Sequence, residues 1–303
     1  MVPPGYRFLV TRRATATSSF GSGKRESHDA SGFYRRFPIP DVTKDDQINS
    51  PAVLDRLFCG DARTMTPAQV KSNSVALVVT SPPYFTGKEY EAEPREGFVP
   101  GTYIEYLEMV GGAFALCHEK LEPGGRMAIN VANLGRRPYR SLSADIISIL
   151  QDDLGMLLRG EIIWQKAKGA GGSCAWGSFR SPANPVLRDV TERVVVASKG
   201  RFDRALSRAE RQRRSLPHVS SMTSDAFMEA TIDVWEIPAE SATRVGHPAP
   251  FPVALPQRLI ELYTYEGDLV LDPFIGSGTT AVAARRTGRH YVGFDTDPFY
   301  IEL

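Results

Sequence analysis

The sequence is poor in cysteine and has no long apolar run, and these two absences exclude whole classes of protein. Its 303 residues contain three cysteines, Cys59, Cys117 and Cys174, at unrelated spacings. They fit neither a disulfide framework nor a paired-cysteine metal site, and no other cluster of ligand side chains has metal spacing. No stretch approaches the roughly 20 apolar residues that span a bilayer, and no apolar segment typical of a signal peptide follows the basic N-terminus. We therefore expect a soluble, cytoplasmic protein with no metal and no membrane segment.

Net charge is also nearly absent, at +1, but the charge is unevenly distributed. Residues 159–218 hold 13 lysines and arginines against 5 acidic residues, a local balance of +8, whereas the rest of the chain holds 23 against 30. One strongly basic segment in an otherwise ordinary chain is typical of proteins that bind a polyanion. A polyanion is the expected partner of this segment.

The apolar pattern predicts an α/β protein with a mainly parallel sheet. From residue 53 onward, short β-type segments that end in polar turns alternate with stretches of helical spacing, and this rhythm is typical of parallel sheets. We expect strands at 57–58, 75–80, 126–131, 161–165, 192–198, 269–271 and 291–294, and helices at 103–121, 253–265 and 279–286.

The same pattern divides the chain into four parts. Residues 1–48 are rich in Ser, Gly, Thr and Arg without a sustained period, so we expect an N-terminal arm that is partly disordered. Residues 49–199 and 236–303 carry the two halves of the α/β domain. Between them the rhythm breaks, and residues 200–235 are expected to form a small insertion.

A glycine-rich turn stands between the last predicted strands. The segment Leu269–Thr280 reads LVLDPFIGSGTT, and Asp295 follows at the end of the next strand. Glycines in such a turn let the backbone approach a ligand at the carboxyl end of the sheet, and an acidic residue one strand later can accept hydrogen bonds from ribose hydroxyls. The turn lacks the third glycine of a dinucleotide motif, and no phosphate-loop GKS or GKT follows. The pattern predicts a site for a nucleoside cofactor.

A second motif, Ser81-Pro82-Pro83-Tyr84, follows an apolar strand segment. Proline fixes its own φ and restricts the residue before it, so the Ser81 hydroxyl and the Pro82 carbonyl are expected to be held rigidly at a strand end. Two such acceptors can take both hydrogens of an amino group, with the Tyr84 ring stacked on the attached base.

Together these motifs resemble those of S-adenosylmethionine-dependent DNA amino-methyltransferases, over roughly residues 53–303. SPPY is associated mainly with N4-cytosine enzymes, whereas N6-adenine enzymes more often carry DPPY or NPPY. The order of catalytic motif, insertion and cofactor motif is similar to the circularly permuted β class, which implies a Rossmann-like fold. The resemblance implies catalytic roles for Ser81, Pro82, Pro83 and Tyr84. It implies cofactor contacts from Asp61, His247, Phe251, Asp272, Pro273, Phe274, Gly276, Ser277, Gly278, Thr279 and Asp295.

The resemblance further implies direct in-line methyl transfer to the N4 amine of a cytosine flipped out of double-stranded DNA. If Ser81 and Pro82 accept the two amino hydrogens, the nitrogen lone pair can face the sulfonium methyl, and alignment of this kind contributes on the order of 7–11 kcal/mol. No covalent intermediate is needed, so the cysteines are expected to be small core residues.

Recognition of the DNA sequence is assigned to the insertion. On a helical projection Arg201, Arg204, Arg208 and Arg211 form one stripe, which predicts a helix that offers these side chains either to phosphates or to solvent. Trp176 is a candidate for DNA contact and equally for the core.

Other functions stay open at this point. The motifs also fit an N6-adenine DNA methyltransferase, because serine at the first motif position is a preference, and an RNA methyltransferase, because a basic segment indicates only a polyanion. A non-catalytic DNA-binding protein would have no need to keep both motifs. The sequence leaves open the recognised site, the presence of a partner endonuclease, and the choice between monomer and homodimer. It also leaves open the role of the arm, and whether the protein acts in a restriction-modification system or as an orphan methylase at a nucleoid.

Overall fold

The computed structural model describes residues 36, 42–83, 85, 100–134, 138–166, 177–187, 189–239 and 251–302. The chain divides into two compact units, Met1–Asp41 and Val42–Leu303. Only Arg36 of the first unit is described, so of the predicted arm, residues 1–48, the structure describes Arg36 and residues 42–48. All helices and strands given below belong to the second unit.

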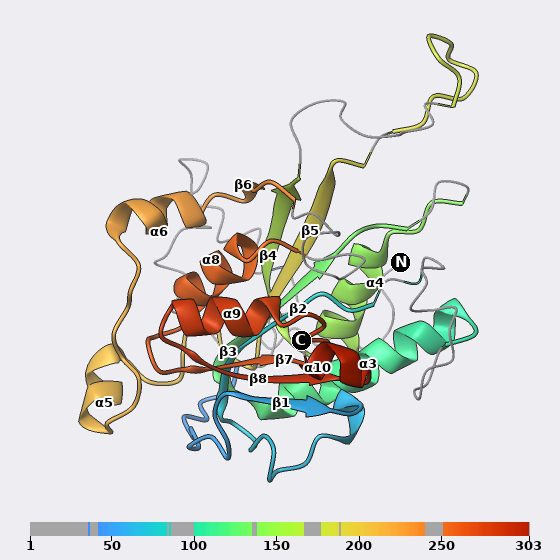
Figure 1. The fold of residues 1–303 in the computed structure, drawn as a ribbon. Helices are drawn as coiled ribbons and strands as arrows, with labels where there is room; N and C mark the ends of the chain where they lie inside the picture. Colours follow the sequence, from blue (N-terminus) through green and yellow to red (C-terminus); the bar gives the residue numbers. More distant parts are fainter. Residues whose placement is uncertain are drawn as a thin grey trace. The chain divides into compact units, whose positions relative to one another are not determined.

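Within the described part of the chain, an eight-stranded sheet has the order β1-β8-β7-β2-β3-β5-β4-β6 (Figure 1). The first five strands in that order run parallel, β5 is antiparallel to both of its neighbours, and β6 is parallel to β4. The prediction of a mainly parallel α/β sheet is therefore confirmed. The strands are β1 Arg56–Cys59, β2 Val75–Thr80, β3 Leu121–Val131, β4 Leu157–Gln165, β5 Thr191–Ser198, β6 Val234–Glu236, β7 Leu269–Asp272 and β8 His290–Asp295.

Helices cover both faces of this sheet. Residues of β2 alternate between the faces, with Val78 in the core beneath α3 and α4 and Val79 in the core beneath α8 and α9. Burial on both faces explains why this strand is a continuous apolar run. The helical segments are η2 Ala62–Thr64, α3 Tyr103–Lys120, α4 Leu142–Ser148, η3 Ile149–Asp153, α5 Arg208–Arg213, α6 Ser224–Ala230, α8 Ala254–Tyr263, α9 Thr279–Arg286 and α10 Pro298–Glu302.

The best predicted elements carry clear local signals. α3 begins at a capping box, in which the Thr102 hydroxyl accepts from the backbone of Glu105 and the Glu105 carboxylate accepts from the backbone of Thr102. α9 spans the predicted residues 279–286, because Gly278 at its N-cap adopts the left-handed conformation that joins it to the glycine-rich turn.

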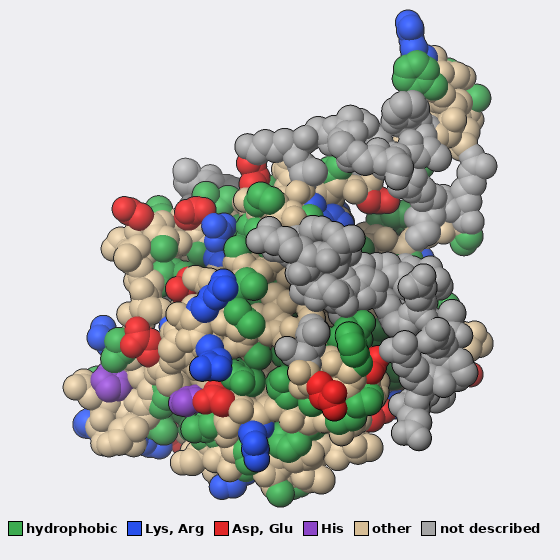
Figure 2. Space-filling view, in the orientation of Figure 1, with side chains coloured by type: hydrophobic (Ala, Val, Ile, Leu, Met, Phe, Trp, Pro, Cys, Tyr) green, Lys and Arg blue, Asp and Glu red, His purple; other side chains and the backbone are tan. Residues whose placement is uncertain are grey.

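The insertion is less separate from the sheet than its composition suggests. β6 lies at the predicted boundary at residue 235 and pairs with the end of β4. Basic side chains are not confined to the insertion either: on the face shown in Figure 2 they gather over α8 and α9, and Arg285 and Arg286 of α9 are exposed.

Candidate functional site

The parallel strands bring the predicted motifs to one edge of the sheet. β1, β8, β7 and β2 are consecutive neighbours that run in the same direction, so their carboxyl ends lie side by side. Asp61 follows β1, Asp295 ends β8, Asp272 ends β7 and Ser81 follows β2. Segments far apart in the sequence, such as those of Asp61 and Asp295, therefore meet where ligands bind in open α/β sheets.

Asp272 joins the catalytic motif to the cofactor motif. Its two carboxylate oxygens accept hydrogen bonds from the hydroxyls of Thr80 and Thr280, each at 2.6 Å, and one of them also accepts from the backbone N–H of Phe274 at 3.0 Å. Burial raises the pKa of Asp272 to about 6, and the nearby charge of Asp295 acts in the same direction. Since Ser81 comes directly after Thr80, this carboxylate fixes the start of the SPPY motif against the glycine-rich turn.

Asp295 holds the other side of that turn. Its carboxylate accepts from the backbone N–H groups of Gly276 and Asp297, both at 2.9 Å. Burial raises the pKa of Asp295, while these backbone bonds lower it. The contact between Asp295 and a ribose stays a prediction, whereas its bonds to Gly276 and Asp297 fix the backbone on both sides of the carboxylate.

The glycine-rich turn is tightly packed beneath and open above. A Cβ atom at Gly293 of β8 would lie 2.8 Å from Ile275 Cγ1 and 2.9 Å from Leu57 Cδ2, so the turn rests directly on the sheet. Gly278 has a φ of 82°, and a Cβ there would meet no heavy atom within 4 Å. An open glycine at a helix N-terminus beside a carboxylate fits a nucleoside cofactor with a charged amino-acid end.

Asp61 is placed at the same edge but is engaged locally. It caps η2, and its carboxylate forms a salt bridge of 2.5 Å with Arg63. Burial raises the pKa of Asp61, but the hydrogen bonds from Arg63 outweigh it and leave the pKa below its ordinary value. A contact to the cofactor would have to share this carboxylate with Arg63.

The remaining predicted site residues fall into three groups. Pro82 is buried, and Ser81, Pro83, Phe274 and Phe251 are partly buried at or near the carboxyl edge. Pro273, Ser277 and Thr279 lie in or beside the glycine-rich turn. Tyr84, Trp176 and His247 lie outside the described residues.

The predicted arginine stripe is wrong. Residues 201–207 are not helical, and α5 begins only at Arg208. Arg208 is exposed, and Arg201 hydrogen-bonds the backbone of Asp45. A helical projection assumes a helix, and here the chain instead folds back against the amino end of the sheet.

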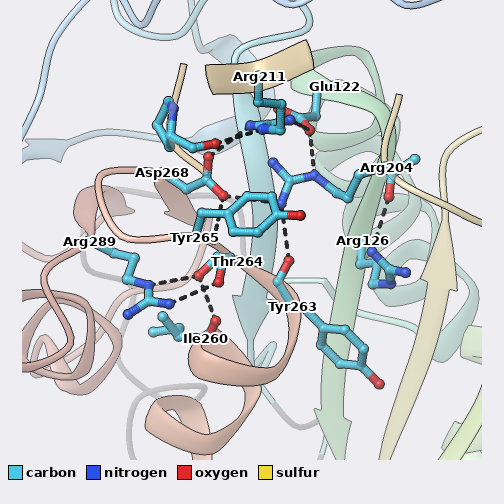
Figure 3. A network of polar contacts seen from close by, with 12 residues as sticks. Glu122, Arg126, Arg204, Arg211, Ile260, Tyr263, Thr264, Tyr265, Asp268 and Arg289 are labelled. Atoms are coloured by element: carbon cyan, nitrogen blue, oxygen red, sulfur yellow. Dashed lines mark hydrogen bonds and ion pairs between the residues drawn. The ribbon is translucent and has the colours of Figure 1, made fainter. Parts of the chain in front are cut away.

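Arg204 and Arg211 point toward the carboxylates of Glu122 and Asp268 (Figure 3), and both arginine side chains are at most 10% exposed. The Arg211 side chain is 1% exposed and lies 3.0 Å from Glu122 and 3.1 Å from Asp268. Arg204 contacts the same two carboxylates at 2.5 and 3.1 Å. The guanidinium groups of both arginines lie over the ring of Tyr265. We therefore remove these two side chains from the candidate DNA contacts: they neutralise two buried carboxylates at the start of β3 and β7.

Sequence reasoning missed the polar residues that organise the site. Thr80 and Thr280 hold Asp272, and a polar trio of buried Asn130, buried Glu192 and partly buried Lys166 lies on the strands beyond β2. The available signal was a polar residue within an otherwise apolar strand segment, since such a group needs a buried partner. The expectation for the cysteines is met by buried Cys117 and is wrong for exposed Cys59, while Cys174 lies outside the described residues.

The described residues offer neither a metal cluster nor a membrane-spanning helix. No group of three or more His, Cys, Asp or Glu side chains there is arranged to hold a metal ion. In that same part of the chain, no helix combines the length and apolar character needed to cross a membrane.

A mainly parallel sheet with helices on both faces, and with a glycine-rich turn beside a Ser-Pro-Pro motif at its carboxyl edge, defines a Rossmann-like fold with a candidate cofactor site. The sequence profile described as DNA methylase, of the N6 and N4 type, matches residues 75–303. The chain belongs to this family of DNA amino-methyltransferases.

Known relatives agree with this assignment. The type II methyltransferase M.BglI of Bacillus subtilis is 30% identical over 296 residues, which cover 80% of this chain and 82% of that protein. A candidate DNA modification methylase of Thermus thermophilus, solved with S-adenosyl-L-methionine, is 29% identical with a TM-score of 0.60 and covers 82% of this chain and 90% of its own. The PvuII DNA methyltransferase, described as cytosine-N4-specific, shares the fold at 20% identity and a TM-score of 0.59, covering 84% and 86% of the two chains.

Proposed function

We propose that this DNA methyltransferase is site-specific and acts on the N4 amine of a flipped cytosine. The observation that carries the proposal is the hydrogen bond of 2.6 Å between Thr80 and Asp272. It joins the SPPY motif to the cofactor turn, so an amino group held by Ser81 and Pro82 lies next to the place where a methyl donor is held.

The cofactor is S-adenosylmethionine, which supplies an electrophilic methyl group on a sulfonium. Gly278 would give it room at the turn, the N-terminus of α9 would receive its charged end, and Asp295 would accept hydrogen bonds from its ribose. Tight packing under the turn, at Gly293 and Ile275, keeps this cradle in place.

The chain's own part in the reaction is to position the acceptor. The Ser81 hydroxyl and the Pro82 carbonyl accept the two hydrogens of the amino group, so its lone pair is aimed at the methyl carbon. The N–C bond forms as the S–C bond breaks, the electrons of that bond stay on sulfur, and the nitrogen then releases one proton to water. Alignment of this kind is worth on the order of 7–11 kcal/mol.

Cytosine is the proposed base because SPPY resembles the motif of N4-cytosine enzymes. Tyr84 is the proposed stacking partner of the flipped base, and a DNA contact is proposed for Trp176. An N6-adenine enzyme remains the second candidate, since the family contains both types.

The role of Ser81 is tested by a matched pair of serine variants. Purified Ser81→Ala and Ser72→Ala are incubated with unmethylated double-stranded DNA and methyl-labelled S-adenosylmethionine. Ser72 lies away from the motif and bonds Glu119, so its variant controls for loss of a hydroxyl. We expect Ser81→Ala to bind the cofactor and DNA normally but to transfer about 100-fold less label than the control variant. Equal transfer by both variants contradicts the assignment of Ser81.

A further inference from the structure

A polar trio lies on the strands beyond β2, beside the methyl-transfer motif. Asn130 Nδ2 of β3 donates to Glu192 Oε2 of β5 at 2.6 Å. Lys166 Nζ, directly after β4, donates to Glu192 Oε1 at 2.8 Å. Asn130 and Glu192 are 4% and 9% exposed, so the two side chains interact inside the protein.

The register of the sheet places Asn130 next to Ser81. β2 and β3 are parallel, with Thr80 opposite Ile129. The next residue on each chain is therefore Ser81 on one and Asn130 on the other, and neighbouring strands lie about 4.8 Å apart. Asn130 thus flanks the acceptor motif on the side away from Asp272.

Glu192 determines which way the Asn130 carboxamide faces. An ionised carboxylate only accepts hydrogen bonds, so the amide nitrogen must point toward it and the amide oxygen is held as the other, accepting end. Lys166 bonds the second carboxylate oxygen and offsets the unfavourable burial of its charge. The trio therefore presents one fixed arrangement beside Ser81.

We propose that Glu192 is a positioning residue of the transfer site, which orients the Asn130 carboxamide beside Ser81 and so fixes how the target amino group is held. The inference rests on the proposed function. Glu192 acts through Asn130. The fixed amide oxygen of Asn130 limits the orientations that an amino group at Ser81 can adopt. Lys166 keeps Glu192 in place.

The main variant is Glu192→Gln, with Glu161→Gln as its control. A glutamine can pair with the Asn130 amide in either direction, so the fixed orientation is lost while the volume is kept. Glu161 lies on β4 with a 39% exposed side chain, 3.9 Å from Arg193, and tests the same change elsewhere in the sheet. For Glu192→Gln we expect kcat to fall about 10- to 100-fold. The KM for DNA and the Kd for S-adenosylmethionine should match those of Glu161→Gln.

Exchanging the partners distinguishes positioning from general support of the fold. In the double variant Asn130→Asp with Glu192→Gln, the carboxylate and the donor change places and the hydrogen bond runs in the opposite direction. The accepting oxygen beside Ser81 is kept, so we expect kcat to recover to within about threefold of the wild type. Asn130→Ala leaves the Glu192–Lys166 pair intact and should reproduce the fall in kcat, which keeps the test decisive if Glu192→Gln does not fold.

The outcomes separate this inference from the proposed function. If the wild-type protein labels DNA and either Glu192→Gln or Asn130→Ala keeps the wild-type kcat, the inference about Glu192 is overturned. The proposed function is then unaffected. A loss confined to cofactor affinity, or a double variant no better than Glu192→Gln, also overturns the inference about Glu192. Wild-type protein that binds S-adenosylmethionine but labels no DNA base rejects the proposed function before any variant is compared.

Discussion

Arg211→Met is the substitution that best tests the buried ion cluster. Arg211 is 1% exposed and makes two ion pairs at 3.0 and 3.1 Å, and its Nε donates to the carbonyl of Pro217 at 2.7 Å. Without it, the buried carboxylates of Glu122 and Asp268 share a single cation, Arg204. Removing one partner of a buried ion pair destabilises a protein by about 3–5 kcal/mol, because a charge is left uncompensated.

The assay is urea unfolding of Arg211→Met beside Arg213→Met. Arg213 lies on the same helix but pairs with Glu210 at the surface, where its side chain is 73% exposed, so its loss should change the unfolding free energy by less than about 1 kcal/mol. We expect the difference between the two variants to exceed about 2 kcal/mol. Equal stabilities would refute the buried cluster. A variant that is fully stable but binds DNA more weakly, with a smaller salt dependence, would restore Arg211 as a phosphate contact.

Three further predictions concern the carboxyl edge. The pKa of Asp272 is raised by burial from 3.8 to about 6, so its protonated form stabilises the fold, and about 3 kcal/mol of stability should be lost as the pH rises between about 4 and 6. In Asp272→Asn this fall should be flattened; the same slope in the variant would contradict the assignment. Gly278→Ala should reduce stability by about 1 kcal/mol, because φ is 82°. It should also weaken S-adenosylmethionine binding measured by calorimetry. Unchanged affinity would show that the cofactor does not contact this turn. Thr80→Val should lower kcat about 10-fold by releasing the SPPY motif from Asp272, and should reduce the free energy of unfolding in urea by about 1–2 kcal/mol; full activity would show that this bond does not position the motif.

Elements whose pattern is local were predictable from the sequence. β2 is a buried apolar run that ends in a Ser-Pro-Pro motif, and α9 lies between a left-handed glycine and a small strand segment. Each signal lies within a few consecutive residues. The sequence alone therefore predicted the positions of this strand and this helix, together with the motif beside each. Their meeting at one edge followed from parallel strand order.

Elements that depend on distant partners were not predictable. β6 is three residues long and is a strand only because it pairs with β4. Arg204 and Arg211 have the spacing of an exposed basic face, yet the partners of Arg211, Glu122 and Asp268, stand 89 and 57 residues away in sequence. Nothing local distinguishes an arginine that meets a phosphate from one that neutralises a buried carboxylate.

The polar trio illustrates the same limit for the site. Asn130, Glu192 and Lys166 each look like an ordinary polar residue near a strand end, and their pairing depends on the antiparallel arrangement of β3, β5 and β4. Once the register is known, their position beside Ser81 follows from the strand spacing. The SPPY motif could be recognised from the sequence, whereas the residues that lie beside it could be identified only from the strand order and register.

The most direct test of the central claim is the identity of the methylated base. The wild-type protein is incubated with methyl-labelled S-adenosylmethionine and unmethylated double-stranded DNA, and the DNA is digested to nucleosides for mass spectrometry. The account predicts label in N4-methylcytosine. Label in N6-methyladenine would contradict the proposed base while leaving the family unchanged, and a protein that binds the cofactor yet labels no DNA base would contradict the proposed activity itself.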